Sequence, residues 1–118
     1  DQVVVRETGV RLIDWDRAAL GPPAQDLGSF IARLEADALQ AGRPRPTKLS
    51  EAFEAAYAAA TGAPATGTSL WTATALFRLA VEPFRSRLPH WPELTRAILD
   101  RVAQHVDRVQ HRSRRLSA

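Results

Sequence analysis

The 118-residue sequence contains no cysteine and no methionine, and Lys48 is its single lysine. Without cysteine the chain can form neither disulfides nor thiolate metal sites. It has no run of about 18 apolar residues, so it predicts no membrane-spanning helix. No signal peptide is visible. Because the chain has a single lysine, arginine supplies nearly all its positive charge. A net charge of only +3 does not by itself indicate nucleic-acid binding.

Apolar residues make up 45% of the chain, which is enough for a core, and the length suits one domain or part of one. An apolar stretch begins at the third residue, and no initiator methionine precedes it. We therefore expect a piece of a longer protein. The expected unit is one partial domain over residues 1–118, with a hairpin at 2–14 and helices at 23–112.

Two short segments near the start, residues 3–5 and 10–13, are β-branched and apolar and predict strands. The polar residues 6–9 between them end in glycine, which is typical of a hairpin loop. A lone hairpin is marginally stable in water, so helices or a further sheet should cover it. The second segment leads into Asp14 and Asp16. Carboxylates at a strand end can hold a hard cation such as Mg²⁺, although aspartate is also common in turns for its own reasons.

Four later segments show the spacing of apolar residues that predicts amphipathic helices. The first starts behind two prolines, carries Asp26 in its first turn and stops near Gly42. The second is expected from Thr47, as its cap, to residue 61. The third begins near residue 68, should be the most buried helix, and is kinked or ended by Pro83.

The fourth predicted helix begins near residue 92 and has one narrow apolar stripe, so it should lie on the outside. The basic residues 112–115 that follow are expected to fray. His90, His105 and His111 share no metal-ligand spacing, and we interpret them as surface residues. The fold class is mainly α with an N-terminal β-hairpin and about four helices.

The sequence Ile13-Asp14-Trp15-Asp16, followed by residues 21–28 (Gly-Pro-Pro-Ala-Gln-Asp-Leu-Gly), resembles the aminoglycoside phosphotransferase and choline kinase family. The resemblance implies part of the C-terminal lobe of a protein-kinase-like fold. It implies an ATP-dependent kinase, with ATP or GTP and Mg²⁺ as cofactors, acting in the cytoplasm. The acceptor would be a hydroxyl of an aminoglycoside-like, choline-like or sugar molecule.

The resemblance also suggests roles for individual residues. Asp14 matches the aspartate that holds Mg²⁺ against the nucleotide phosphates, and Asp16 matches the second acid of the motif, which orients the first acid or the metal-bound waters. Gln2 stands where the family has a metal-binding asparagine; the alternative is a polar residue at a strand entry. Asp26 matches a brace beneath the catalytic loop, or is simply a helix-start acid. Pro22 replaces a family aspartate.

The family's His-Gly-Asp catalytic loop, glycine-rich phosphate loop and strand lysine are absent from this sequence. We therefore assign no catalytic residue and expect no phosphoryl transfer from this chain alone. The expected partners are the missing N-terminal lobe, a nucleotide and a small hydroxyl substrate, rather than a membrane or nucleic acid. Two alternatives remain: a helical binding module whose basic tail, residues 108–115, contacts nucleic acid or an acidic partner, and a catalytically degenerate kinase-like domain, suggested by Gln2 and Pro22.

Overall fold

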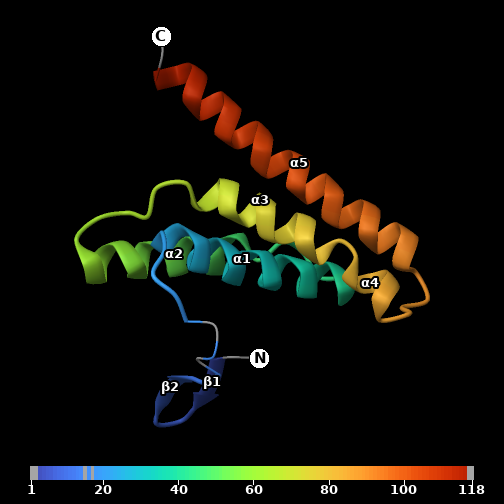
Figure 1. The fold of residues 1–118 in the computed structure, drawn as a ribbon, viewed down its shortest axis with the longest axis horizontal. Helices are drawn as coiled ribbons and strands as arrows, with labels where there is room; N and C mark the ends of the chain where they lie inside the picture. Colours follow the sequence, from blue (N-terminus) through green and yellow to red (C-terminus); the bar gives the residue numbers. More distant parts are fainter. Residues whose placement is uncertain (1–2, 15, 17, 117–118) are drawn as a thin grey trace.

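The computed structural model describes residues 3–14, 16 and 18–116. It is mainly helical and begins with a two-stranded antiparallel hairpin (Figure 1). The elements are β1 (Val3–Arg6), β2 (Gly9–Leu12), α1 (Pro23–Gln40), α2 (Thr47–Thr61), α3 (Thr68–Leu79), α4 (Glu82–Arg85) and α5 (Trp91–Leu116). The predicted fold class is confirmed, with four long helices and the four-residue α4.

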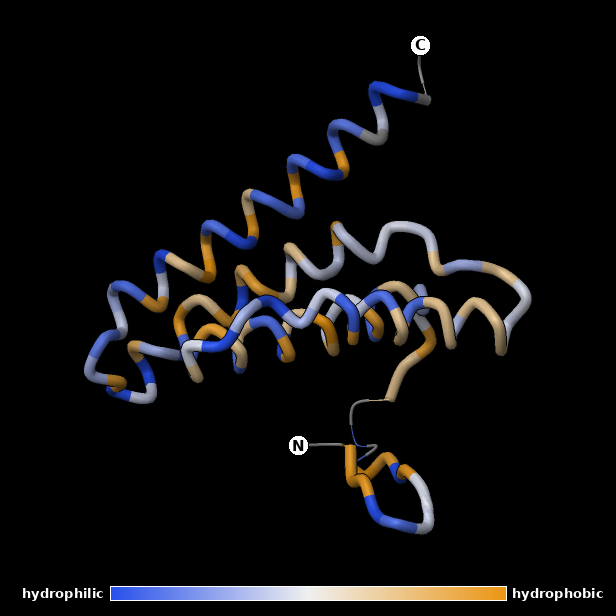
Figure 2. Tube along the Cα trace, turned by 180° about the vertical axis from the view of Figure 1, so that it is seen from behind, coloured by the Kyte–Doolittle hydropathy of each residue, from blue (hydrophilic) through white to orange (hydrophobic). Residues whose placement is uncertain are grey.

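The hairpin pairs Val3 with Leu12 and Val5 with Val10. Because directly paired residues point to the same side of a sheet, these four side chains form one apolar face. All four are exposed, between 36% and 73%. Figure 1 shows the hairpin set apart from the helices, and Figure 2 shows its hydrophobic colouring. We expected either helices or a further sheet to cover the hairpin. The helices that the structure describes do not cover it.

Helix α1 starts and stops where its sequence indicates. Pro23 occupies the first helical turn, where its missing amide proton is not needed. At the other end, the Gly42 amide donates to the Leu39 carbonyl and the Arg43 amide to the Ala38 carbonyl, at 3.1 and 2.8 Å. With Gly42 at φ +63°, this is a Schellman motif, which glycine favours. The turn directs residues 43–46 back beside α1.

Helices α1, α3 and α5 form the core. Ala32, Leu76, Ala80 and Ile98 make one buried cluster, and Leu76 is fully buried. At Gly28 the helices α1 and α3 approach closely, because a Cβ there would lie 2.7 Å from the Thr72 backbone nitrogen. Small residues at this crossing let the two helices pack tightly.

Helix α2 packs more loosely than its neighbours. None of its residues is buried, and its Phe53 ring meets Phe30 of α1 with centroids 4.7 Å apart. The prediction that Thr47 caps this helix is wrong. Pro46 holds the cap position, and no side chain caps the helix end, because Thr47 already has helical geometry.

The predicted break at Pro83 is confirmed: α3 ends at Leu79, and the chain continues through α4, which has Pro83 in its first turn. The expectation that α3 is the most buried helix is wrong, since α1 has seven buried residues and α3 has four. Leu70 and Phe77 lie on the solvent side of α3 and are more than half exposed. The apolar residues around α3 therefore do not all face the core.

Helix α5 lies across α3 on the outside of the bundle, as predicted, and extends beyond it (Figure 1). The Thr95 hydroxyl donates to the Ala80 carbonyl at 3.0 Å, and Ile98 enters the core. The basic tail does not fray but continues the helix to Leu116. Within the described part of the chain, none of the helices combines the length and apolar character needed to cross a bilayer.

Candidate functional site

Asp14 lies two residues beyond the end of β2. Its side chain is exposed, and its backbone has φ +63°, in the left-handed region. Aspartate adopts this conformation more readily than β-branched residues do. Among non-glycine residues in the described part of the chain, only Asp14 and Arg87 have a positive φ. Unusual backbone geometry of this kind is often found at functional sites.

The predicted metal site has two further residues. Asp16 is exposed, like Asp14. Gln2 lies outside the described residues. Within the described residues, no three histidine, aspartate or glutamate side chains gather as a metal-binding cluster. A Mg²⁺ ion that uses one or two carboxylates, with water and phosphate oxygens as its other ligands, does not need such a cluster. The exposed carboxylates of Asp14 and Asp16 fit that demand.

Asp26 lies in the first turn of α1 and is exposed. A negative charge there interacts favourably with the helix dipole and the free amide groups. The brace suggested by the resemblance would require a catalytic loop that this chain lacks. That role stays a prediction.

A shallow groove of about 360 Å³ borders the start of α1. Its walls are Pro22, Pro23 and Ala24 on one side, Tyr57 and Thr61 of α2 on another, and residues 63–66 of the following loop. None of these residues is charged. The groove therefore offers apolar surface and hydroxyl groups close in sequence to the predicted metal motif.

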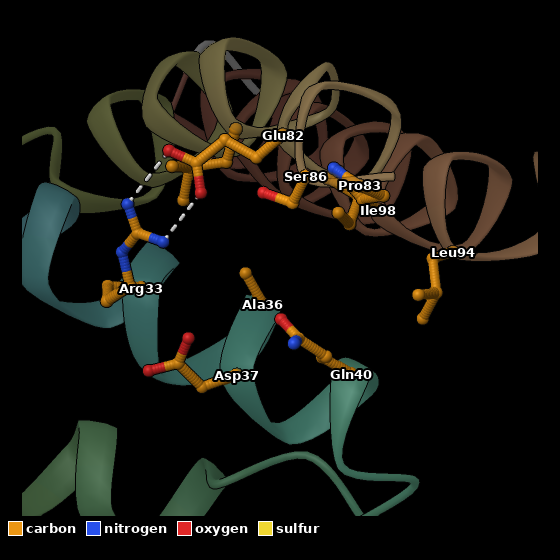
Figure 3. A pocket seen from close by; sticks show the side chains of 10 residues that line it. Arg33, Ala36, Asp37, Gln40, Glu82, Pro83, Ser86, Leu94 and Ile98 are labelled. Atoms are coloured by element: carbon orange, nitrogen blue, oxygen red, sulfur yellow. Dashed lines mark hydrogen bonds and ion pairs between the residues drawn. The ribbon is translucent and has the colours of Figure 1, made fainter. Parts of the chain in front are cut away.

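A second, much smaller cleft of about 40 Å³ lies between α1 and the α4–α5 region (Figure 3). Arg33 and Glu82 bridge its rim through two hydrogen bonds of 2.8 and 3.1 Å. The hydrogen bond to Glu82 raises the pKa of Arg33, and the same bond lowers the pKa of Glu82. The cleft has little more than the volume of a water molecule, about 30 Å³, so it cannot hold a small-molecule acceptor.

The sequence analysis missed a buried polar cluster. Glu35 of α1 is 3% exposed and accepts a hydrogen bond from Arg45 Nε at 2.8 Å. Arg45 Nη2 lies 2.6 Å from the same carboxylate oxygen, as an ion pair. The Nε2 atom of His105, on α5, lies 3.1 Å from the same carboxylate oxygen. Burial favours the neutral acid, but the interactions with His105 and Arg45 together outweigh it, so the pKa of Glu35 is lowered.

The interpretation of His105 as a surface residue is wrong, because it is only 4% exposed. A signal for its burial was present. His105 continues the apolar stripe of α5 formed by Ile98 and Val102, at helical intervals of four and three residues. Glu35 likewise lies between Ile31 and Ala38 on the buried stripe of α1. A polar residue on such a stripe indicates a buried partner.

A family model for the phosphotransferase enzyme family matches residues 3–77. The match covers more than half of the chain, from the hairpin through Asp14, Asp16 and α1 into α3. Comparison with curated proteins and with solved structures gave no significant match.

Proposed function

Since the chain belongs to the phosphotransferase enzyme family, we propose that it forms part of the C-terminal lobe of an ATP-dependent kinase. The enzyme would transfer a phosphoryl group to a hydroxyl of a small aminoglycoside-like, choline-like or sugar molecule. The observation that carries this proposal is the family match over residues 3–77, which includes Asp14 and Asp16, both exposed and both just after the hairpin.

In this proposal Asp14 supplies a carboxylate oxygen to Mg²⁺, and Asp16 orients that carboxylate or the metal-bound waters. Bound Mg²⁺ neutralises charge on the nucleotide phosphates as the phosphoryl group leaves. Gln2 would add an amide oxygen, and Asp26 would brace the catalytic loop from the start of α1. GTP is the alternative nucleotide.

In this proposal the catalytic base and the nucleotide-binding lobe are supplied by polypeptide outside this sequence, because the residues that form them in the family are not found here. The exposed apolar face of the hairpin supports the proposal that further polypeptide packs against it. Its four exposed aliphatic side chains form a continuous apolar face, and burying one side chain of this kind contributes about 1.5–3 kcal/mol. We propose that the rest of the kinase domain covers this face. The proposal places the enzyme in the cytoplasm.

The proposal is tested with Asp14→Asn in the complete enzyme. The substitution keeps the size of the side chain but removes its charge, so it should reduce Mg²⁺-dependent phosphoryl transfer at least about a hundredfold, as expected for loss of one electrostatic contact in the transition state. Circular dichroism should be unchanged, because Asp14 is exposed. Glu7→Gln is the matched control: it removes an exposed acid from the hairpin turn and should leave turnover intact.

Full turnover in Asp14→Asn would refute the metal role. A wild-type enzyme that binds Mg²⁺ and nucleotide but transfers no phosphate would instead support the degenerate-domain alternative. Manganese titration of the 118-residue chain gives an independent readout, since the paramagnetic ion should broaden the NMR signals around Asp14 in the wild type and not in Asp14→Asn.

A further inference from the structure

Three ionisable side chains from separate segments meet inside the protein. Glu35 comes from α1, Arg45 from the loop joining α1 and α2, and His105 from α5. Their side chains are 3%, 12% and 5% exposed. The proposed metal site does not use them, and His105 lies outside the residues that match the family model.

The hydrogen-bonding roles in this cluster conflict at one atom. His105 Nε2 lies 2.5 Å from Arg45 Nη2 and 3.1 Å from Glu35 Oε1. A guanidinium nitrogen can only donate, and a carboxylate oxygen can only accept. His105 Nε2 can therefore accept from Arg45 when it carries no proton, or donate to Glu35 when it carries one. It cannot do both.

We infer that the proton on His105 Nε2 is a switch that latches or releases the loop between α1 and α2. Without this proton, Arg45 bridges Glu35 and His105 and holds the loop against both helices. When the imidazolium forms, its Nε2–H pairs with Glu35, and Arg45 then faces a second cation in a site shielded from water. Two buried cations competing for one carboxylate oxygen repel each other, so Arg45 leaves and the loop detaches.

Two buried atoms show that the cluster is not fully satisfied in its latched form. Within the described part of the chain, Glu35 Oε2 and His105 Nδ1 have no hydrogen-bond partner. Unpaired buried polar atoms are costly. A cluster with this deficit gains less from staying closed than a fully paired one.

Other charged groups do not provide an alternative partner for His105. On α5, Arg101 donates to Gln104 at 3.4 Å, and Gln104 also accepts from Arg45 at 3.2 Å. The single ionisable residue of α3, Arg78, is exposed in its last turn. Glu82 of α4 pairs with Arg33. The charged groups that the hydrogen bonds and ion pairs of the described residues bring to the imidazole are those of Glu35 and Arg45.

Release of the loop would be transmitted to α2. This helix has no buried residue, and it is connected to α1 by the Phe30–Phe53 contact and by the latched loop. Tyr57 and Thr61 of α2 form one wall of the uncharged groove beside the start of α1. A proton on His105 would thus loosen the wall of that groove from a distance.

The test is amide hydrogen exchange of the 118-residue chain from about pH 8 to about pH 5.5, the range in which histidines titrate. The amides to follow are those of Arg43 and Thr47 at the two ends of the loop. They donate to the carbonyls of Ala38 and Arg45, respectively, each at 2.8 Å. After correction for intrinsic exchange rates, their protection should fall as the pH falls. The limit is about tenfold per pH unit for one linked proton.

His105→Gln should remove this pH response, whereas His111→Gln, which changes an exposed histidine of the same helix, should keep it. The nitrogen chemical shifts of His105 at pH 8 should show a bare Nε2. Protection that does not vary with pH in the wild type, an unchanged response in His105→Gln, or a protonated Nε2 at pH 8 would overturn the inference. If His105→Gln does not fold, Arg45→Gln serves instead: it should give low protection at every pH, and a retained pH response there would equally refute the latch.

Discussion

Gly28 offers the sharpest test of how this fold is packed, because two effects of replacing it by alanine have opposite signs. Gly28 lies within α1, where alanine is favoured over glycine by about 1 kcal/mol. A Cβ at this position, however, would lie 2.7 Å from the Thr72 nitrogen, 2.7 Å from Trp71 Cβ and 2.8 Å from the Trp71 carbonyl carbon. Helix propensity predicts stabilisation, and packing predicts destabilisation.

The packing term should dominate. The contacts are about 0.7 Å shorter than the 3.4 Å at which ordinary van der Waals contact begins. Two of the three contacting atoms belong to the α3 backbone, so no side-chain rotation relieves them and α3 must move as a unit. Overpacking costs about 1–3 kcal/mol, and an immobile neighbour places this site near the upper limit. After the propensity gain is subtracted, Gly28→Ala should lose about 2 kcal/mol, or about 8 °C in Tm for a chain of this length.

The loss can be measured by urea and thermal unfolding, followed by far-ultraviolet circular dichroism and tryptophan fluorescence. Gly21→Ala is the matched control, since its Cβ would lie 3.6 Å from the flexible Gln25 side chain. That change should alter the free energy of unfolding by no more than about 1 kcal/mol. A Gly28→Ala variant as stable as the wild type would show that α1 and α3 do not approach as closely as described.

Two further predictions concern ion pairs. The pKa of Glu35 is lowered in the fold, so its carboxylate contributes stability that is present above its unfolded-state pKa and is lost as the pH falls through the lower folded-state pKa. Glu35→Gln should cost about 3–5 kcal/mol near neutral pH and flatten the acid limb of stability plotted against pH; an unchanged acid limb would contradict the assignment. The Arg33–Glu82 pair is about half exposed. A double-mutant cycle with alanine should give a coupling of about 0.5 kcal/mol that shrinks in high salt, and a salt-independent coupling above about 2 kcal/mol would be inconsistent with that exposure.

The sequence by itself determined the features that depend on neighbouring residues. The hairpin followed from two β-branched segments around a turn that ends in Gly9, and the end of α1 followed from Gly42, whose left-handed backbone completes the Schellman turn. The family followed from Asp14 and Asp16 in their spacing from Asp26. Each of these signals lies within a few residues of the structure it specifies, so it can be recognised without knowing the rest of the fold.

Only the tertiary structure decided which distant residues meet. The closeness of Gly28 to α3 depends on how two helices cross, and the partner of His105 lies 70 residues away on α1. The pattern along α5 gives the position of His105 on the buried stripe, but it does not reveal that Glu35 and Arg45 lie next to that position. The exposed face of the hairpin also depended on the tertiary structure. Apolar strands predict burial, and only the structure shows that the side chains of this face are exposed. Short-range steric and capping preferences determine the local geometry, whereas the packing of the whole chain determines which buried charges pair.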